Sequence, residues 1–224
     1  MLRRRNLGRR RCKKFGGWTP LLDTGLLIWL LAGYGMTLDG DGKVMYWDGM
    51  GGGARVTFTV RPTPVASDAV FGRPSLNFAG NCFGTATVTQ SDTSSMLVVA
   101  RGSSNDTILL AGGGGIRALY NTPTGKWGCY NGTQKDSTVS LATPAIELVR
   151  WGTASKLYVN ARTPATGNWG AKAQSTEITV GAYSGSRYCN GVIAEVVITT
   201  TQTDANDLNL LNQAAAYYGF TLGA

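Results

Sequence analysis

Short runs of apolar or alternating residues, each bounded by Gly, Asn, Asp or Pro, recur along most of this sequence. In a run such as RVTFTV, β-branched and aromatic residues alternate with polar ones, which is typical of a half-buried β-strand. The bounding residues are those that tight turns require. The pattern therefore predicts an all-β, antiparallel two-sheet sandwich. The expected strands are residues 43–47, 55–60, 75–79, 95–101, 107–112, 116–121, 145–151, 156–161, 177–183 and 192–200.

The length and composition fit one such domain. Sandwiches of this kind reach 224 residues as a single unit. Glycine, at 31 residues, is about twice as frequent as usual, while 43% of residues are hydrophobic and 15% are charged. We expect residues 1–20 to form a basic arm and linker, and residues 21–224 to form one sandwich domain.

The apolar run at residues 26–32 is only seven residues long. A membrane-spanning helix needs about 20 residues, so we expect no membrane span. The run predicts a fully buried first strand. A cleaved secretory signal remains an alternative, because basic residues precede the run.

Two further segments carry local signals. LDGDGK at residues 38–43 predicts a hairpin, because repeated Asp-Gly supplies the positive φ values of tight turns. Near the C-terminus, a helix is expected to begin at Thr203 or Asp204 and to end at Gly219. This helix should pack over one edge or face of the sandwich. Its expected apolar stripe is Leu208, Leu211, Ala215 and Tyr218.

All of the net charge of +8 lies at the N-terminus. Residues 1–14 contain six Arg, two Lys and no acid, and in the rest of the chain the positive and negative charges cancel. Such an arm gains affinity for polyanions by counterion release and by bidentate phosphate contacts. It could bind nucleic acid, enter an acidic groove of another virion protein, or remain a solvated tail. The charged residues are Arg3, Arg4, Arg5, Arg9, Arg10, Arg11, Lys13 and Lys14.

The chain contains no histidine, which excludes Ser-His-Asp and Cys-His nucleophilic machinery and imidazole metal sites. Its cysteines, Cys12, Cys82, Cys129 and Cys189, form no C-x-x-C pair, so a metal-thiolate site is not indicated. We expect buried free thiols. A disulfide within the last three is an alternative, and its pairing stays open.

The order of motifs resembles concanavalin A-like, laminin-G-like sandwich domains across residues 24–221. The opening motifs are LLIWLLAGYG, VMYWD, RP and GRPSLNF, and the closing ones are LYVN, GVIAEV and YYGF. The resemblance implies a jelly roll of about a dozen strands. Relatives include lectins, glucanases and adhesive modules, and similar compact copies occur in bacteriophage virion proteins.

Glucanases of this fold use closely spaced carboxylates, since retaining hydrolysis needs two carboxyls about 5 to 5.5 Å apart. This chain has three glutamates, Glu147, Glu177 and Glu195, and none has an acidic residue within four positions. We therefore predict that the protein is not an enzyme.

Some relatives bind calcium through loop carboxylates, because Ca²⁺ prefers six to eight oxygen ligands. Asp39, Asp41 and Asp48 are the acidic cluster that could do so. Turn formation explains these aspartates without an ion, so no cofactor is expected.

Glycan binding needs an aromatic platform beside amide and backbone donors. Two segments, residues 125–133 and 182–191, combine aromatic rings with Asn, Ser and Gly. Alternatively, these rings cover hydrophobic edges or subunit contacts. The candidate glycan-binding residues are Trp127, Tyr130, Asn131, Tyr183, Tyr188 and Asn190.

The sequence thus favours a non-enzymatic virion structural, decoration or adhesion module, anchored by its arm to a capsid or tail partner or to nucleic acid. A carbohydrate-binding lectin is the alternative, and a secreted glycoside hydrolase-like protein is less favoured. We expect a homo-oligomer, located in a virion or else secreted or on a cell surface, with host glycans as further partners.

Overall fold

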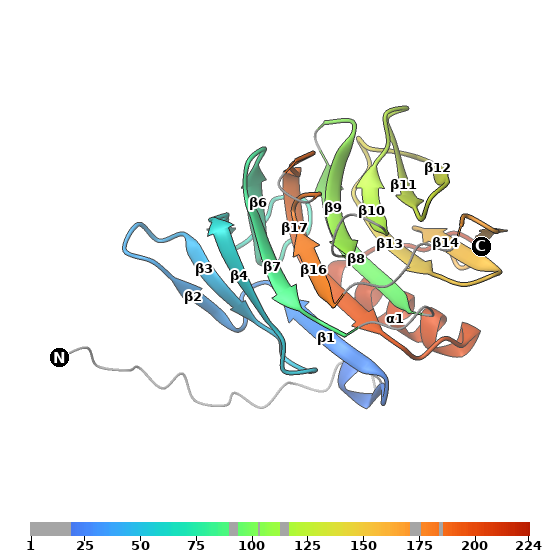
Figure 1. Ribbon diagram of the computed structural model, residues 1–224, viewed down its shortest axis with the longest axis horizontal. Coiled ribbons are helices and arrows are strands. Elements are labelled where there is room, and N and C mark those ends of the chain that lie inside the picture. The colour runs from blue at the N-terminus through green and yellow to red at the C-terminus, as the bar shows by residue number, and fades with distance from the viewer. Residues whose placement is uncertain (1–18, 90–93, 103, 113–116, 171–175, 184–185) are drawn as a thin grey trace.

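A computed structural model describes residues 19–89, 94–102, 104–112, 117–170, 176–183 and 186–224. Two sheets lie face to face (Figure 1), and all pairs of named strands are antiparallel. The predicted two-sheet sandwich with one C-terminal helix is therefore confirmed.

The sheet that we call the helix-side sheet has eight strands, in the order β15-β14-β13-β8-β17-β6-β5, with β1 paired to β17. Its strands are β1 (Leu26–Leu31), β5 (Thr63–Val65), β6 (Ser75–Ala79), β8 (Ser95–Gly102), β13 (Ala145–Arg150), β14 (Ser155–Val159), β15 (Ala165–Gly167) and β17 (Asn190–Thr199).

The other sheet, which we call the open sheet, has nine strands in the order β12-β11-β10-β9-β16-β7-β4-β3-β2. Its strands are β2 (Met36–Leu38), β3 (Val44–Asp48), β4 (Arg55–Val60), β7 (Phe83–Thr87), β9 (Thr107–Gly112), β10 (Ala118–Asn121), β11 (Lys126–Tyr130), β12 (Gln134–Ser140) and β16 (Glu177–Val180).

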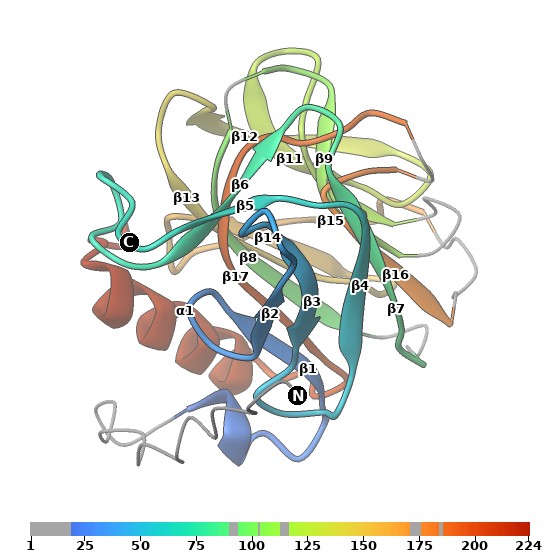
Figure 2. The same cartoon turned by 90° about the vertical axis from the view of Figure 1, so that its left-hand side faces the viewer.

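A 15-residue helix, α1 (Asp204–Tyr218), packs on the outer face of the helix-side sheet, away from the open sheet (Figure 2). The Thr203 hydroxyl caps its first turn by accepting a hydrogen bond from the backbone N–H of Asn206 at 3.1 Å. Gly219, with φ of 73°, ends the helix in the left-handed conformation that glycine tolerates best. The predicted start and end of the helix are confirmed. A short 3-10 turn, η1 (Pro20–Leu22), precedes β1.

The helix-side sheet is buried on both faces, so it has a core on each side. Between the two sheets lie large side chains such as Trp47, Trp127 and Trp151. Between the sheet and α1 lie Trp29 and Leu211, with others. This double burial explains why β8 and β17 read as continuous apolar runs rather than as alternating ones.

Several predictions about individual segments are confirmed. Residues 55–60, 75–79 and 107–112 coincide with β4, β6 and β9. The run at 26–32 supplies the first strand, and residues 38–43 form the β2 to β3 hairpin. The three described cysteines, Cys82, Cys129 and Cys189, are free and buried.

Other strands were not predicted. β7, β11 and β12 each contain glycine or several polar residues, which hide the alternating pattern. The segment 177–183 was predicted as one strand, but β16 ends at Val180 because Gly181 turns the chain with φ of 85°. Within the described residues, no helix is long and apolar enough to cross a membrane.

Candidate functional site

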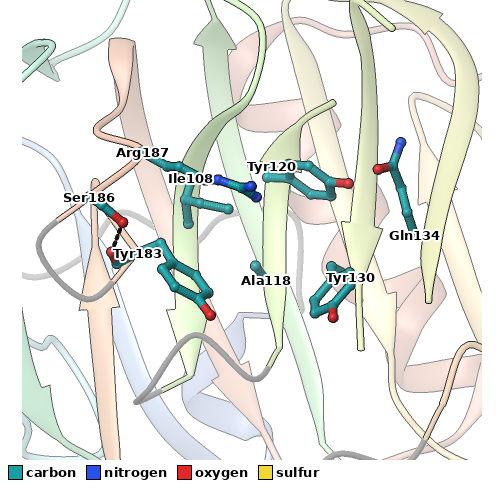
Figure 3. Close-up of a pocket in the computed structure, with 8 residues that line it drawn as sticks. All are labelled: Ile108, Ala118, Tyr120, Tyr130, Gln134, Tyr183, Ser186 and Arg187. Atoms are coloured by element: carbon teal, nitrogen blue, oxygen red, sulfur yellow. Dashed lines mark hydrogen bonds between the residues drawn. The ribbon is translucent and has the colours of Figure 1, made fainter. Parts of the chain in front are cut away.

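The outer face of the open sheet carries a pocket of about 540 Å³. It lies over β9, β10 and β11, beside the turn that follows β16 (Figure 3). The residues that line it are Ile108, Ala118, Tyr120, Tyr130, Gln134, Tyr183, Ser186 and Arg187.

Strand register places these side chains in two rows across the sheet. In the first row, Ile108 lies opposite Tyr120, which lies opposite Gly128 and then Asp136. Residues directly opposite each other on neighbouring strands have their Cβ atoms about 5 Å apart, so neighbouring side chains of a row can touch, and Gly128, which has no side chain, leaves a gap in the first row.

The second row makes the pocket hollow. Ala111 lies opposite Ala118, which lies opposite Tyr130 and then Gln134. Ala118 leaves a low floor, and the half-buried rings of Tyr130 and Tyr183 stand on either side of it (Figure 3). The site therefore combines a small residue in its floor with aromatic rings in its walls.

Tyr183 is positioned by hydrogen bonds with Ser186. Its backbone N–H donates to the carbonyl of Ser186 at 2.8 Å, and the N–H of Ser186 donates back at 2.7 Å. The hydroxyl of Ser186 also donates to the carbonyl of Tyr183 (Figure 3). These contacts fix the backbone of Tyr183, which supplies one aromatic wall of the pocket, to that of Ser186.

Two residues with left-handed backbone meet at the rim. Asp106 has φ of 55° and Arg187 has φ of 47°. Their side chains form an ion pair at 3.4 Å, and the N–H of Ile108 donates to the carbonyl of Arg187 at 2.9 Å. Positive φ is uncommon and costly for residues with a side chain, and such residues cluster at functional sites. The rim is therefore a candidate for a functional constraint.

Tyr120 forms the deeper part of the pocket, with only 3% of its surface exposed. Burial, followed by the negative charges of Asp136 and Asp106, raises the pKa of Tyr120 well above its usual range. Its hydroxyl consequently keeps its proton at physiological pH and remains a hydrogen-bond donor.

The structure brings together only two of the predicted glycan-binding residues, Tyr130 and Tyr183. The prediction for Trp127 was wrong, because this side chain is fully buried between the sheets and donates to the carbonyl of Thr143. Trp127 and Tyr130 are an odd number of positions apart on β11, so they point to opposite faces.

The remaining candidates have structural contacts outside the pocket. Asn131 is 1% exposed and donates to the carbonyl of Gly170 at 2.8 Å. Tyr188 packs against Phe83, with ring centroids 5.8 Å apart. Asn190 lies at the start of β17.

Sequence reasoning missed Ile108, Tyr120, Gln134 and Arg187. Their signal was available in part, since 107–112 and 116–121 were predicted as strands, and alternation places Tyr120 and Ala118 on one face. The pairing of β10 with β11 and of β11 with β12 was not predicted, so the sequence did not indicate that these residues lie together.

The aspartates predicted as calcium candidates do not form a common site. Asp39 accepts from Arg61 at 2.6 Å, and this contact with Arg61 is the main cause that lowers the pKa of Asp39. Asp48 pairs with Arg55 at 2.5 Å, and Asp41 is exposed. Among the described residues, no group of three or more acidic or cysteine side chains could hold a metal ion. The eight cationic residues of the arm lie outside the described residues.

No protein-family profile matches this sequence, and no curated protein matches it. Solved structures do match. The structure of domain 4 of AbnA, an extracellular GH43 arabinanase from Geobacillus stearothermophilus in complex with arabinotriose, aligns with a TM-score of 0.57 at 12% identity. The alignment covers 84% of this chain and 98% of that domain.

Two larger proteins contain a similar domain. Trypanosoma rangeli sialidase aligns with a TM-score of 0.55 at 11% identity, over 84% of this chain and 32% of that chain. The binding domain of botulinum neurotoxin DC in complex with SialylT aligns with a TM-score of 0.53 at 12% identity, over 85% of this chain and 52% of that chain. At these identities the likeness concerns the fold alone: this chain shares the β-sandwich of these domains.

Proposed function

We propose that this protein is a carbohydrate-binding, lectin-like module whose site is the pocket on the open sheet. The observation that carries the proposal is the pairing of two half-buried tyrosine rings, Tyr130 and Tyr183, with a low floor at Ala118. Aromatic faces pack against the C–H faces of sugars, while Gln134, Ser186 and Arg187 offer polar groups for hydroxyls.

The solved structures named above support this proposal over the virion role that the sequence favoured. One of them is in complex with arabinotriose and another with SialylT. The likeness raises the expectation of glycan binding. Because one fold can host many functions, the argument for this chain rests on its own pocket.

We also propose that the protein binds glycans without hydrolysing them. No Asp or Glu is among the described residues that line the pocket. Glu147 and Glu195 are fully buried, in the two cores, and Glu177 opens β16. Glycoside hydrolysis generally requires two carboxyls flanking one bond, and the carboxylates that lie near this pocket, Asp106 and Asp136, are not among the described residues that line it.

The basic arm supports a second role, as an anchor. The virion context, a polyanionic protein or nucleic-acid partner, homo-oligomerisation and a secreted or surface location all remain predictions. Replacing the six arginines of residues 1–14 by glutamine should remove salt-sensitive binding to DNA, RNA or acidic proteins and leave glycan binding intact. If the wild type and the glutamine variant bound polyanions equally well, the anchoring role would be contradicted.

The glycan proposal is tested by single substitutions in the full chain. Tyr130→Ala and Tyr183→Ala should each weaken binding to the best glycan of an array by at least about tenfold, because each removes an aromatic wall. Calorimetry provides the affinities. Tyr34→Ala, at an exposed tyrosine in the turn after β1, is the matched control and should bind like the wild type. Glycan binding that survives both pocket substitutions would place the site elsewhere.

A further inference from the structure

The charged groups around the pocket indicate which glycans it accepts. Arg187 is the one cation among the described lining residues. Its guanidinium lies beside Tyr120 and Ile108 (Figure 3) and is already paired with Asp106 at 3.4 Å. An acidic sugar would therefore have to compete with a carboxylate that the protein itself supplies.

A second carboxylate lies close to the same end of the pocket. Asp136 follows Gly128 in the row that contains Tyr120, and its charge contributes to the raised pKa of Tyr120. The Asp136 carboxylate accepts hydrogen bonds from Gln134 and Thr124, which are uncharged donors.

No further lysine or arginine is described as lining this end of the site. Lys126 lies on the same face of β11, but it does not line the pocket, and its ammonium donates to the carbonyl of Thr138. The charged side chains that act on the pKa of Tyr120 are thus two carboxylates, Asp136 and Asp106, and one cation, Arg187.

A paired guanidinium and carboxylate suit hydroxyl groups better than anions. Each sugar hydroxyl can both donate and accept, so it can bond Arg187 and Asp106 without separating them. A sugar carboxylate or sulfate can only accept, and it would be repelled by Asp106 and Asp136.

We propose that the pocket selects neutral glycans over acidic ones, and that Asp106 determines this selectivity by keeping Arg187 in an ion pair. This inference rests on the proposed glycan-binding function and deepens it. It concerns ligand charge and leaves the identity of the sugar open.

Asp106→Asn is a suitable variant for the test. Asn tolerates the left-handed conformation of residue 106 at least as well as Asp, so the backbone should be preserved. The substitution removes one negative charge and frees Arg187. Asp41→Asn makes the same charge change at an exposed residue of the β2 to β3 hairpin and is the matched control.

The experiment compares the full-length wild type, Asp106→Asn and Asp41→Asn by calorimetry against neutral oligosaccharides and their acidic counterparts, such as lactose with sialyllactose and methyl-esterified with free oligogalacturonate. The basic arm is common to all three chains, so its contribution cancels when the neutral-to-acidic affinity ratio of one chain is compared with that of another, and measurement at high salt screens it within each chain. We expect the wild type to prefer neutral members. In Asp106→Asn, the ratio of affinity for the neutral member to affinity for the acidic member should fall by about fivefold. In Asp41→Asn, this ratio should stay as in the wild type.

The outcomes separate the two proposals. Wild-type preference for acidic members, or an unchanged ratio in Asp106→Asn, would overturn the selectivity while glycan binding by the pocket stood. An equal change of the affinity ratio in Asp41→Asn would also overturn the proposed role of Asp106, because the loss of one negative charge anywhere on the protein would then explain the result. Absence of binding to every member would remove the proposed function and this inference together.

Discussion

The two outer faces of the sandwich are built differently. On the helix-side sheet, the outer face is apolar and continuous, and α1 covers it with Leu210, Leu211 and Ala214. On the open sheet, the outer face has a small cluster around Ile108 and Tyr120, hollowed over Ala118. The first face contributes stability by burial, while the second leaves aromatic surface available to a ligand.

Ionisable groups follow the same division. Beneath α1, Glu195 is fully buried and accepts a hydrogen bond from the indole of Trp29 at 2.7 Å. At the open face, Asp106 and Arg187 are about half exposed, with 44% and 54% of their side-chain surfaces accessible. Carboxyl groups should therefore affect folding stability on the helix side and ligand choice on the open side.

The largest expected effect tests the covered face. Leu211→Ala removes a fully buried side chain between α1 and the sheet and should lower the free energy of unfolding by about 2 to 5 kcal/mol. Chemical denaturation measures this change. A loss below about 1 kcal/mol would mean that the packing of the helix contributes little to the free energy of unfolding and that the two outer faces do not differ in their contribution to stability.

Glu195 makes stability depend on pH. Burial raises the pKa of Glu195 from its ordinary 4.5 to about 7, although the hydrogen bond from Trp29 acts in the opposite direction. The folded state therefore holds this proton more tightly than the unfolded chain does. The free energy of unfolding should fall as pH rises from about 4.5 to about 7, by up to about 3 kcal/mol from this group.

Glu195→Gln provides the control for that prediction, because a glutamine oxygen can still accept from Trp29. The free energy of unfolding of the variant should depend less steeply on pH over the same range. Burial also raises the pKa of Asp207, to about 6, so part of the decline should persist. A slope identical to that of the wild type would show that Glu195 does not retain its proton.

A smaller effect is expected where α1 begins. Thr203→Ala removes the hydroxyl that caps the first turn and should cost about 1 kcal/mol. Thr203→Ser keeps the hydroxyl and serves as the control in the same thermal or chemical denaturation. Equal losses in both variants would point to the methyl group rather than to the cap.

The smallest stability effect belongs to the open face. Gln134→Ala changes an exposed side chain at the edge strand and should alter the free energy of unfolding by no more than about 0.5 kcal/mol. Glycan affinity measured by calorimetry should nevertheless fall, because Gln134 lines the pocket. A variant that loses stability but keeps its affinity would reverse the proposed division between the faces.

Much of the fold was predictable because its signals are local. Residues 55–60 alternate strictly, and β4 has those bounds. Thr203 and Gly219 delimit α1 as cap chemistry requires. β12 was not predicted, since its polar side chains suit an edge strand and resemble those of a loop.

The candidate site was predictable only in part. Tyr130 and Tyr183 were recognised because aromatic rings among Asn, Ser and Gly are visible in sequence. Trp127 was wrongly grouped with them, because without the assignment of β11 the side to which each ring points is unknown.

The sequence by itself determined the class of fold, the position of the helix and the absence of imidazole chemistry, since these depend on residue type and local spacing. The tertiary structure decided which strands lie side by side. Only the pairing of β9, β10, β11 and β12 builds the two rows of the pocket, and only the turn after β16 brings Arg187 to Asp106. Contacts between residues so distant in sequence depend on register and on burial of the whole sheet, which no local pattern specifies.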